Sequence, residues 1–150
     1  MVQITRGDTG KRISCSILRN GEILSLSWTN SLFRLFVTET YRANEGMLVQ
    51  TGVTFADPKG KEPPRVRPED VEDLYHTGGP FMAEGLYRPF QRIVFRVGEI
   101  GNPILKMQDS QIALAEEVGF GGTVVLESRP LTSNEHSCYP MDTIEDKANN

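Results

Sequence analysis

The sequence contains little cysteine, few aromatic residues and no long apolar segment. Its two cysteines, among 150 residues, are too few for a disulfide framework and lack the short Cys-x-x-Cys spacing of zinc and redox sites. We therefore expect a reduced protein in which Cys15 is a small core residue and Cys138 a free surface thiol. A metal site that uses His136 and Cys138 is the alternative.

Two classes of partner are disfavoured by these shortages. No apolar run approaches the roughly 20 residues that a membrane-spanning helix needs, and the N-terminus lacks the apolar stretch of a signal peptide. Sixteen Lys and Arg residues oppose 20 Asp and Glu, for a formal net charge of −4, whereas nucleic-acid-binding proteins depend on basic contacts to phosphate. We expect a soluble protein made in the cytoplasm, with neither nucleic acid nor a membrane as its partner.

The sequence is rich instead in period-two alternation, which is typical of half-buried strands. Two alternating segments flank Asn20-Gly21, and Asn-Gly in this setting favours a type I′ turn. We therefore predict a hairpin over residues 11–28. Residues 32–38 are apolar on both faces and predict a central strand.

Further strands and turns follow. Residues 47–55 predict a strand with a bulge or a close backbone approach at Gly52, and Asp57-Pro58-Lys59-Gly60 fits a type I turn. Later strands are expected in the four segments 87–97, 104–107, 112–115 and 123–127, although residues 113–117 fit a helical turn equally well.

One short helix is predicted in the long connection after residue 60. Pro68 fits a first helical position, and acidic residues follow it in the first turn. Apolar residues at helical spacing then continue for two turns, until Gly78 ends the helix.

These elements together predict a mostly β protein, an immunoglobulin-like antiparallel β-sandwich with one short helix in a long connection. The sequence lacks the β-α-β alternation of a parallel nucleotide-binding sheet. We assign residues 1–128 to the sandwich. Residues 129–150 are polar and interrupted by prolines, so we expect a tail that is mobile until a partner orders it.

No combination of residues indicates catalysis. The signatures Gly-x-Ser-x-Gly and His-Glu-x-x-His are absent, and residues 119–122 precede a predicted strand instead of the helix that a phosphate-binding loop needs. His76 close to the acidic residues 69–73 leaves a weak metal site open, without the spacing of a calcium loop. We therefore expect no enzymatic activity and no cofactor.

A segment of mixed charge is the candidate for partner binding. Its members are Lys59, Lys61, Arg65, Arg67, Glu69, Asp70 and Asp73. Adjacent basic and acidic groups usually form a solvated surface, but they can also fix the register of a contact with another subunit. We predict such a contact at these residues.

The N-terminal part also shows an ordered series of motifs. It reads Ile4-Thr5-Arg6-Gly7-Asp8-Thr9, a strand, Asn20-Gly21, and then the apolar segments 23–26 and 33–37. This series resembles the N-terminal immunoglobulin-like domain of tailed-phage baseplate upper proteins. The turn at residues 57–60 and the Ala83–Tyr87 approach to a strand are similar as well. Residues 27–31 depart from the Leu-Thr-Gly-Ala segment of that family.

The resemblance implies a non-enzymatic structural component of a tailed-phage particle, in a tail, baseplate, fibre-attachment, neck or head-decoration position. Its partners would be copies of itself and other virion proteins, reached through sheet edges, loops and the C-terminal tail. It would be made in the bacterial cytoplasm, reside in the virion and need no small-molecule substrate. A small soluble module that binds or inhibits a host protein is the alternative, and a small β-barrel enzyme ranks last.

Overall fold

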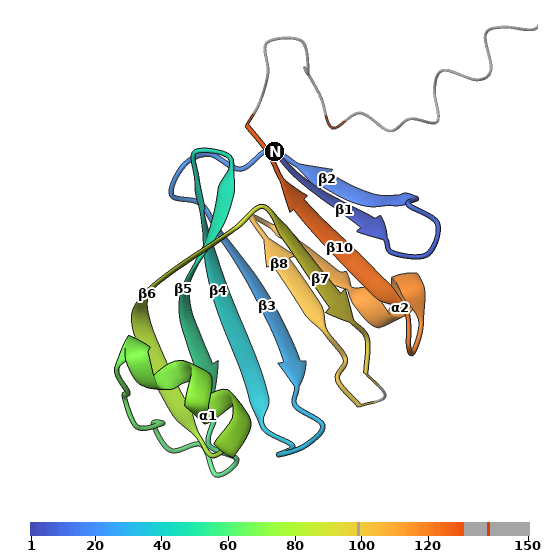
Figure 1. The fold of residues 1–150 in the computed structure, drawn as a ribbon. Helices are drawn as coiled ribbons and strands as arrows, with labels where there is room; N and C mark the ends of the chain where they lie inside the picture. Colours follow the sequence, from blue (N-terminus) through green and yellow to red (C-terminus); the bar gives the residue numbers. More distant parts are fainter. Residues whose placement is uncertain (99, 131–137, 139–150) are drawn as a thin grey trace, which may run out of the picture.

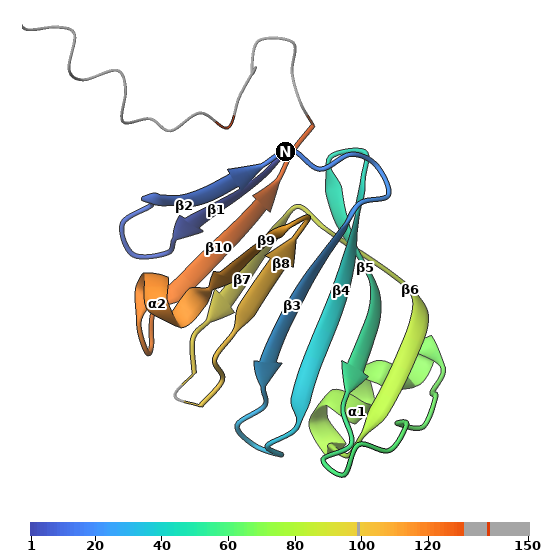
Figure 2. The ribbon, with the colours of Figure 1, turned by 180° about the vertical axis from the view of Figure 1, so that it is seen from behind.

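The computed structural model describes residues 1–98, 100–130 and 138. Within these residues, ten strands form two antiparallel sheets that pack together (Figures 1 and 2). The four-stranded sheet has the order β2-β1-β10-β7, and the six-stranded sheet has the order β6-β5-β4-β3-β8-β9. The predicted mostly β sandwich, with a short helix in the long connection, is confirmed.

The elements have the following bounds. The four-stranded sheet contains β2 (Arg12–Ser16), β1 (Val2–Arg6), β10 (Thr123–Ser128) and β7 (Arg92–Arg96). The six-stranded sheet contains β6 (Phe81–Phe90), β5 (Met47–Phe55), β4 (Phe36–Asn44), β3 (Ile23–Thr29), β8 (Ile104–Met107) and β9 (Ser110–Ala113). The helical segments are η1 (Pro68–Asp70), α1 (Val71–Thr77) and α2 (Leu114–Val118). In the described part of the chain, no helix is long and apolar enough to span a membrane.

The predicted hairpin over residues 11–28 is wrong. Its two segments form β2 and β3, which belong to different sheets, and β2 pairs with β1 instead. The Asn20-Gly21 turn lies where the chain crosses between the sheets. There the Gly21 N–H donates to Ala43 O at 2.8 Å and Asn20 Oδ1 accepts from the Glu45 N–H at 2.9 Å. The turn therefore docks on the β4–β5 hairpin.

The β4–β5 hairpin has the tight turn that the sequence analysis placed elsewhere. Glu45 and Gly46 both have positive φ, 48° and 80°, as a type I′ turn requires. β4 begins at Phe36, later than the predicted start at Leu32, because residues 31–33 form a turn. β4 is nevertheless an interior strand of its sheet, as predicted.

Other local predictions are confirmed. The helix runs through η1 and α1 and ends at Gly78, which has φ 78°. The Gly60 N–H donates to Asp57 O at 3.0 Å and closes the predicted turn. The β5–β6 register shifts at Gly52, and a Cβ added there would lie 3.3 Å from Ala83 O. Gly52 therefore lies beside a bulge and makes a close approach to the backbone of β6.

Two apolar clusters lie on the inner face of the six-stranded sheet. The first packs this face against the four-stranded sheet and includes Leu24, Leu26, Leu105, Val124 and Leu126. The second packs it against α1 and includes Val37, Val53, Phe55, Val71 and Phe81. Figure 1 shows α1 and the four-stranded sheet on the same side of the larger sheet. The four-stranded sheet and α1 therefore pack against separate parts of the same face of the larger sheet.

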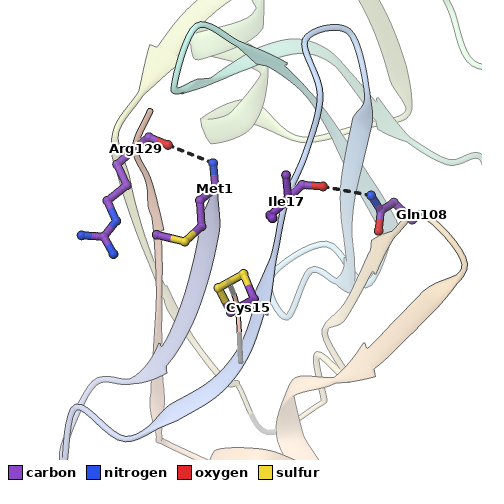
Figure 3. Close-up of a disulfide and its surroundings, with 6 residues drawn as sticks. Met1, Cys15, Ile17, Gln108 and Arg129 are labelled. Carbon is purple, nitrogen blue, oxygen red and sulfur yellow. Dashed lines mark hydrogen bonds between the residues drawn. A yellow bond between two sulfur atoms is a disulfide. The ribbon is translucent and has the colours of Figure 1, made fainter. Parts of the chain in front are cut away.

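A disulfide joins Cys15 of β2 to Cys138, 123 residues later (Figure 3). The expectations of a free Cys138 thiol and of a reduced protein are therefore wrong, and Cys15 is half-buried instead of a core residue. The same bond removes the thiol that the alternative metal site with His136 would have used. Sequence spacing does not reveal such a pair, because the fold alone sets the distance between the two sulfurs.

The end of the sandwich is also held to the start of the chain. The Met1 amino group donates to Arg129 O at 2.9 Å (Figure 3). The Arg129 N–H donates to Met1 O at 3.0 Å. These bonds extend the pairing of β1 with β10 beyond the strand ends. Apart from Arg129, Pro130 and Cys138, the predicted tail 129–150 lies outside the described residues.

Candidate functional site

The charged residues predicted to contact a partner extend from the turn after β5 into α1. Arg65 lies 3.6 Å from Glu84, and Arg67 lies 3.3 Å from Asp70 and 3.9 Å from Glu69. Exposed pairs of this kind contribute little to stability. The arginines and the acids of η1 thus partly neutralise one another on the surface. Their role in partner binding stays a prediction.

Lys59, Lys61 and Asp73 lie apart from these pairs. The two lysines line a hollow of about 450 Å³ together with Phe33, Leu35, Asp57, Pro58, Gly79 and Pro80. Asp73 is exposed on α1, and its backbone oxygen accepts a hydrogen bond from the Thr77 hydroxyl at 3.1 Å. The described residues contain no group of three or more His, Cys, Asp or Glu side chains placed to hold a metal ion.

A polar pocket lies elsewhere, between α1, β7 and the inner face of the six-stranded sheet. We call it the Glu39 pocket. Its volume is about 350 Å³, and its lining residues are Glu39, Tyr41, Gln50, Glu72, Tyr75, His76, Arg88, Phe90 and Ile93. These residues come from β4, β5, β6, β7 and α1, so the pocket exists only in the folded protein.

Glu39 lies at the boundary between the two apolar clusters. Alternate residues of a strand point to the same face, and Glu39 lies between Val37 of the second cluster and Tyr41 of the first. A carboxylate at this position interrupts an otherwise apolar face. Burial of a charged group is costly when it lacks hydrogen-bond partners.

Two tyrosines supply those partners. The Tyr41 hydroxyl donates to Glu39 Oε2, and the Tyr75 hydroxyl donates to Glu39 Oε1 at 2.8 Å. Burial raises the pKa of Tyr41 and of Tyr75 above their ordinary value, and the negative charge of Glu39 raises both pKa values further. The hydroxyls consequently stay protonated and hold the carboxylate in a defined orientation.

Gln50 forms a buried part of the same pocket. Gln50 is only 3% exposed, and its side-chain Nε2 lies 3.5 Å from the Tyr75 hydroxyl. The amide oxygen of Gln50 has no hydrogen-bond partner among the residues described here. Buried polar atoms are usually hydrogen-bonded, so this oxygen is an available acceptor in the pocket wall.

A bulge in β5 brings Gln50 into the pocket. Thr40 pairs with Gly52 while Tyr41 pairs with Gln50, so Thr51 is an extra residue on β5. In an unbroken ladder Thr51 would oppose Tyr41. Gln50 also pairs with Arg88 of β6. Bulges commonly reorient side chains beside functional sites, and here one bulge aligns Tyr41, Gln50 and Arg88 across three strands.

The Glu39 pocket was not predicted from the sequence. One signal was present, because alternate residues of β4 are Val37, Glu39, Tyr41 and Ala43, which places a single charged residue on an apolar face. Tyr75, Gln50 and Arg88 have no comparable local signal. The pocket combines an oriented carboxylate, an amide oxygen that no described residue binds, and aromatic walls, which is an arrangement suited to binding a polar ligand.

A second surface feature lies at one end of the sandwich, where three connections between strands come together (Figure 1) and expose apolar side chains. We call residues 30–36, 97–98, 100–103 and 119–122 the loop end. Its large exposed side chains, with their exposed fractions, are Leu32 (75%), Phe36 (53%), Ile100 (42%) and Phe120 (73%).

Backbone hydrogen bonds hold these loops side by side. The Thr29 N–H donates to Gly101 O at 2.8 Å, and the Gly121 N–H donates to Val97 O at 2.9 Å. The first bond joins the start of the β3–β4 connection to the β7–β8 loop. The second joins that loop to the loop before β10, so the exposed side chains belong to one connected region.

Comparison with known proteins gives no relative, since no family model, no curated protein and no solved structure matches the chain.

Proposed function

We propose that the protein is a non-enzymatic structural component of a tailed-phage particle that assembles with neighbouring subunits. The observation that supports this proposal best is the loop end, where three large apolar side chains are exposed on adjacent loops and a fourth, Phe36, is exposed at the start of β4. Clustered apolar exposure in a soluble protein commonly marks a protein–protein contact. The motifs at the N-terminus, which resemble a phage baseplate domain, favour the virion as the setting.

Sheet edges offer further assembly surfaces. Among the described strands, β2, β7, β6 and β9 each lie at the edge of a sheet. Edge strands present unpaired backbone groups that another chain can extend. The charged segment at residues 59–73 and the tail 129–150 would add contacts to copies of this protein or to other virion proteins.

The disulfide bears on the proposed location. Disulfides persist in oxidising surroundings, which include virion surfaces, and are rare in the cytosol. In our proposal the chain is made in the bacterial cytoplasm, and the Cys15–Cys138 bond closes after the particle leaves the cell. Alkylation of free cysteine thiols, first in particles still inside the cell and then in particles released by lysis, would reveal when the bond forms.

Quantitative peptide mass spectrometry of purified particles tests the proposal. We expect a fixed copy number relative to the major capsid protein. Small multiples of three or six would indicate a tail, baseplate or neck position, and hundreds of copies would indicate head decoration. Abundance in infected cells together with absence from particles would overturn the proposal in favour of a soluble module that binds a host protein.

A pair of variants tests the loop end itself. Phe120→Ser removes an apolar side chain from the loop end, and Ile23→Ser removes an exposed apolar side chain from β3, an interior strand outside the loop end; the two residues are 73% and 50% exposed. We expect Phe120→Ser to lower incorporation into particles and Ile23→Ser to leave it unchanged, with little loss of stability in either. Equal incorporation of both variants would exclude the loop end as an assembly surface.

A further inference from the structure

We propose that the Glu39 pocket binds an organic cation, namely an alkylammonium or alkylguanidinium group such as the end of a Lys or Arg side chain. The proposal goes beyond the assembly role and stands whether or not the protein belongs to a virion. It assigns a ligand class to a cavity built by five elements of the fold.

The oxygen atoms of Glu39 and Gln50 in this pocket have hydrogen-bonding positions left unfilled by the described residues. Each oxygen of Glu39 receives one phenolic hydrogen bond, whereas an ionised carboxylate has about four acceptor positions in all. Within the described residues, Glu39 forms no ion pair, although Arg88 lines the same pocket. The amide oxygen of buried Gln50 is a further acceptor, and it has no partner within the described part of the chain. Together these atoms offer a cationic donor several unfilled hydrogen-bonding positions.

Aromatic rings form part of the pocket wall. Tyr41, Tyr75 and Phe90 line the pocket, and the rings of Tyr41 and Phe90 meet edge to face with centroids 6.2 Å apart. Aromatic faces attract ammonium and guanidinium groups, most strongly where water is displaced. A neutral polar ligand would gain nothing comparable from these rings and the carboxylate together.

Size and charge agree with this ligand class. The volume of about 350 Å³ is near the lower end of the range for small-molecule sites, about 300–1,000 Å³. Glu72 adds a second carboxylate to the lining, against one guanidinium from Arg88 and the imidazole of His76. Arg88 would repel a cationic ligand and would attract an anionic one, so its removal separates the two classes.

The binding experiment uses the full-length oxidised protein and three probes with the same butyl chain. The probes are n-butylammonium, n-butylguanidinium and the uncharged N-butylurea, titrated while amide shifts are followed by NMR. We expect saturable shifts in α1 and in the middle of β4 and β5 with both cations, and none with N-butylurea. Absence of saturable shifts with the cations, or equal shifts with N-butylurea, would overturn the proposal.

Two variants carry the charge test. Glu39→Gln removes the carboxylate and should weaken binding of n-butylguanidinium by about tenfold, since a charged hydrogen-bonded partner is lost. Arg88→Gln removes a like charge and should strengthen it. Arg88 is exposed, so we expect the Arg88→Gln variant to fold. It therefore tests whether the ligand is a cation even if Glu39→Gln fails to fold. Weaker cation binding in Arg88→Gln would point to an anionic ligand and overturn the proposal.

A fourth probe distinguishes the sources of the cation. N-acetyl-lysine methylamide presents the same ammonium group on a peptide backbone. Tighter binding of this compound than of n-butylammonium would identify a protein side chain as the natural ligand. Equal binding would identify the ammonium group itself, as in a free amine.

Discussion

Tyr75 of α1 donates a hydrogen bond of 2.8 Å to Glu39 Oε1 of β4, across 36 residues of sequence. The bond lies beside an edge-to-face contact of Tyr75 with Phe55, whose ring centroid is 5.3 Å away. One residue of the short helix thus joins the apolar cluster below α1 to the polar pocket beside it.

Replacement of Tyr75 by Phe keeps the ring and removes the donor. We expect the free energy of unfolding to fall by about 1–3 kcal/mol, the cost of losing a hydrogen bond to a charged acceptor. Urea denaturation measures the change. Tyr87→Phe is the matched control, because Tyr87 is 72% exposed and has no side-chain hydrogen bond among the described residues. A loss of equal size in the two variants would contradict the role of the Glu39 bond.

The raised pKa values of Tyr41 and Tyr75 predict a loss of stability at alkaline pH. Unfolding returns both groups to an ordinary pKa of about 10, so above this pH the unfolded chain releases protons that the folded protein keeps. Stability from this source is fully present below about pH 10 and falls above it, by up to about 1.4 kcal/mol per pH unit for each tyrosine. Urea denaturation at a series of pH values between about 8 and about 11 measures how steeply the free energy of unfolding falls with pH.

Tyr75→Phe provides the control for this pH dependence. The variant retains only one of the two buried hydroxyls, so its loss of stability with rising pH should be shallower than that of the natural protein. Tyrosinate absorbance should show that Tyr41 and Tyr75 ionise only together with unfolding. An unchanged slope in the variant would show that other groups cause the alkaline loss.

Gly78 and Gly79 offer a test of the helix end. Both have positive φ, 78° and 93°, but a Cβ on Gly78 would lie 2.4 Å from the Phe33 ring, whereas a Cβ on Gly79 meets nothing within 4 Å. Gly79→Ala should cost about 1–2 kcal/mol for the backbone alone. Gly78→Ala should cost at least about 1 kcal/mol more, because the ring must move. Thermal or urea unfolding measures both, and equal losses would show that Phe33 yields freely.

The disulfide predicts a redox-dependent stability. The Cys15–Cys138 bond closes a loop with a sequence separation of 123 residues, and loss of a bond that restricts the unfolded chain to this extent costs about 2–5 kcal/mol. The double variant Cys15→Ser and Cys138→Ser should therefore unfold at lower urea concentration than the oxidised protein. Reduction of the natural protein should give the same shift. Two titratable thiols in the air-oxidised native protein would contradict the pairing.

Short-range interactions account for what could be predicted from the sequence. The helix after residue 67 follows from Pro68, its acidic first turn and Gly78, all within a few positions of one another. The strand at residues 47–55, the bulge at Gly52 and the turn at 57–60 follow from alternation and turn residues. The mostly β sandwich was accessible for the same reason, since many short strands without β-α-β alternation permit few other architectures.

Pairing partners were not accessible in this way. Asn20-Gly21 forms a turn as its residue types favour, yet the flanking strands enter different sheets, because a turn motif does not specify which strand the next segment joins. The candidate pocket was missed for a similar reason. Glu39 is visible as a charged residue on an apolar strand face, but Gln50 reaches it through a bulge and Tyr75 through the packing of α1.

Local chain chemistry was therefore enough for the strands, the helix and the class of fold, because propensity, alternation and turn geometry act between neighbours. Only the tertiary structure brought Cys15 to Cys138 and Tyr75 to Glu39. Contacts over such separations depend on which surfaces bury one another, and burial is a property of the whole packed chain. The disulfide and the Glu39 pocket, both central to the proposals for this protein, were therefore decided by the tertiary structure.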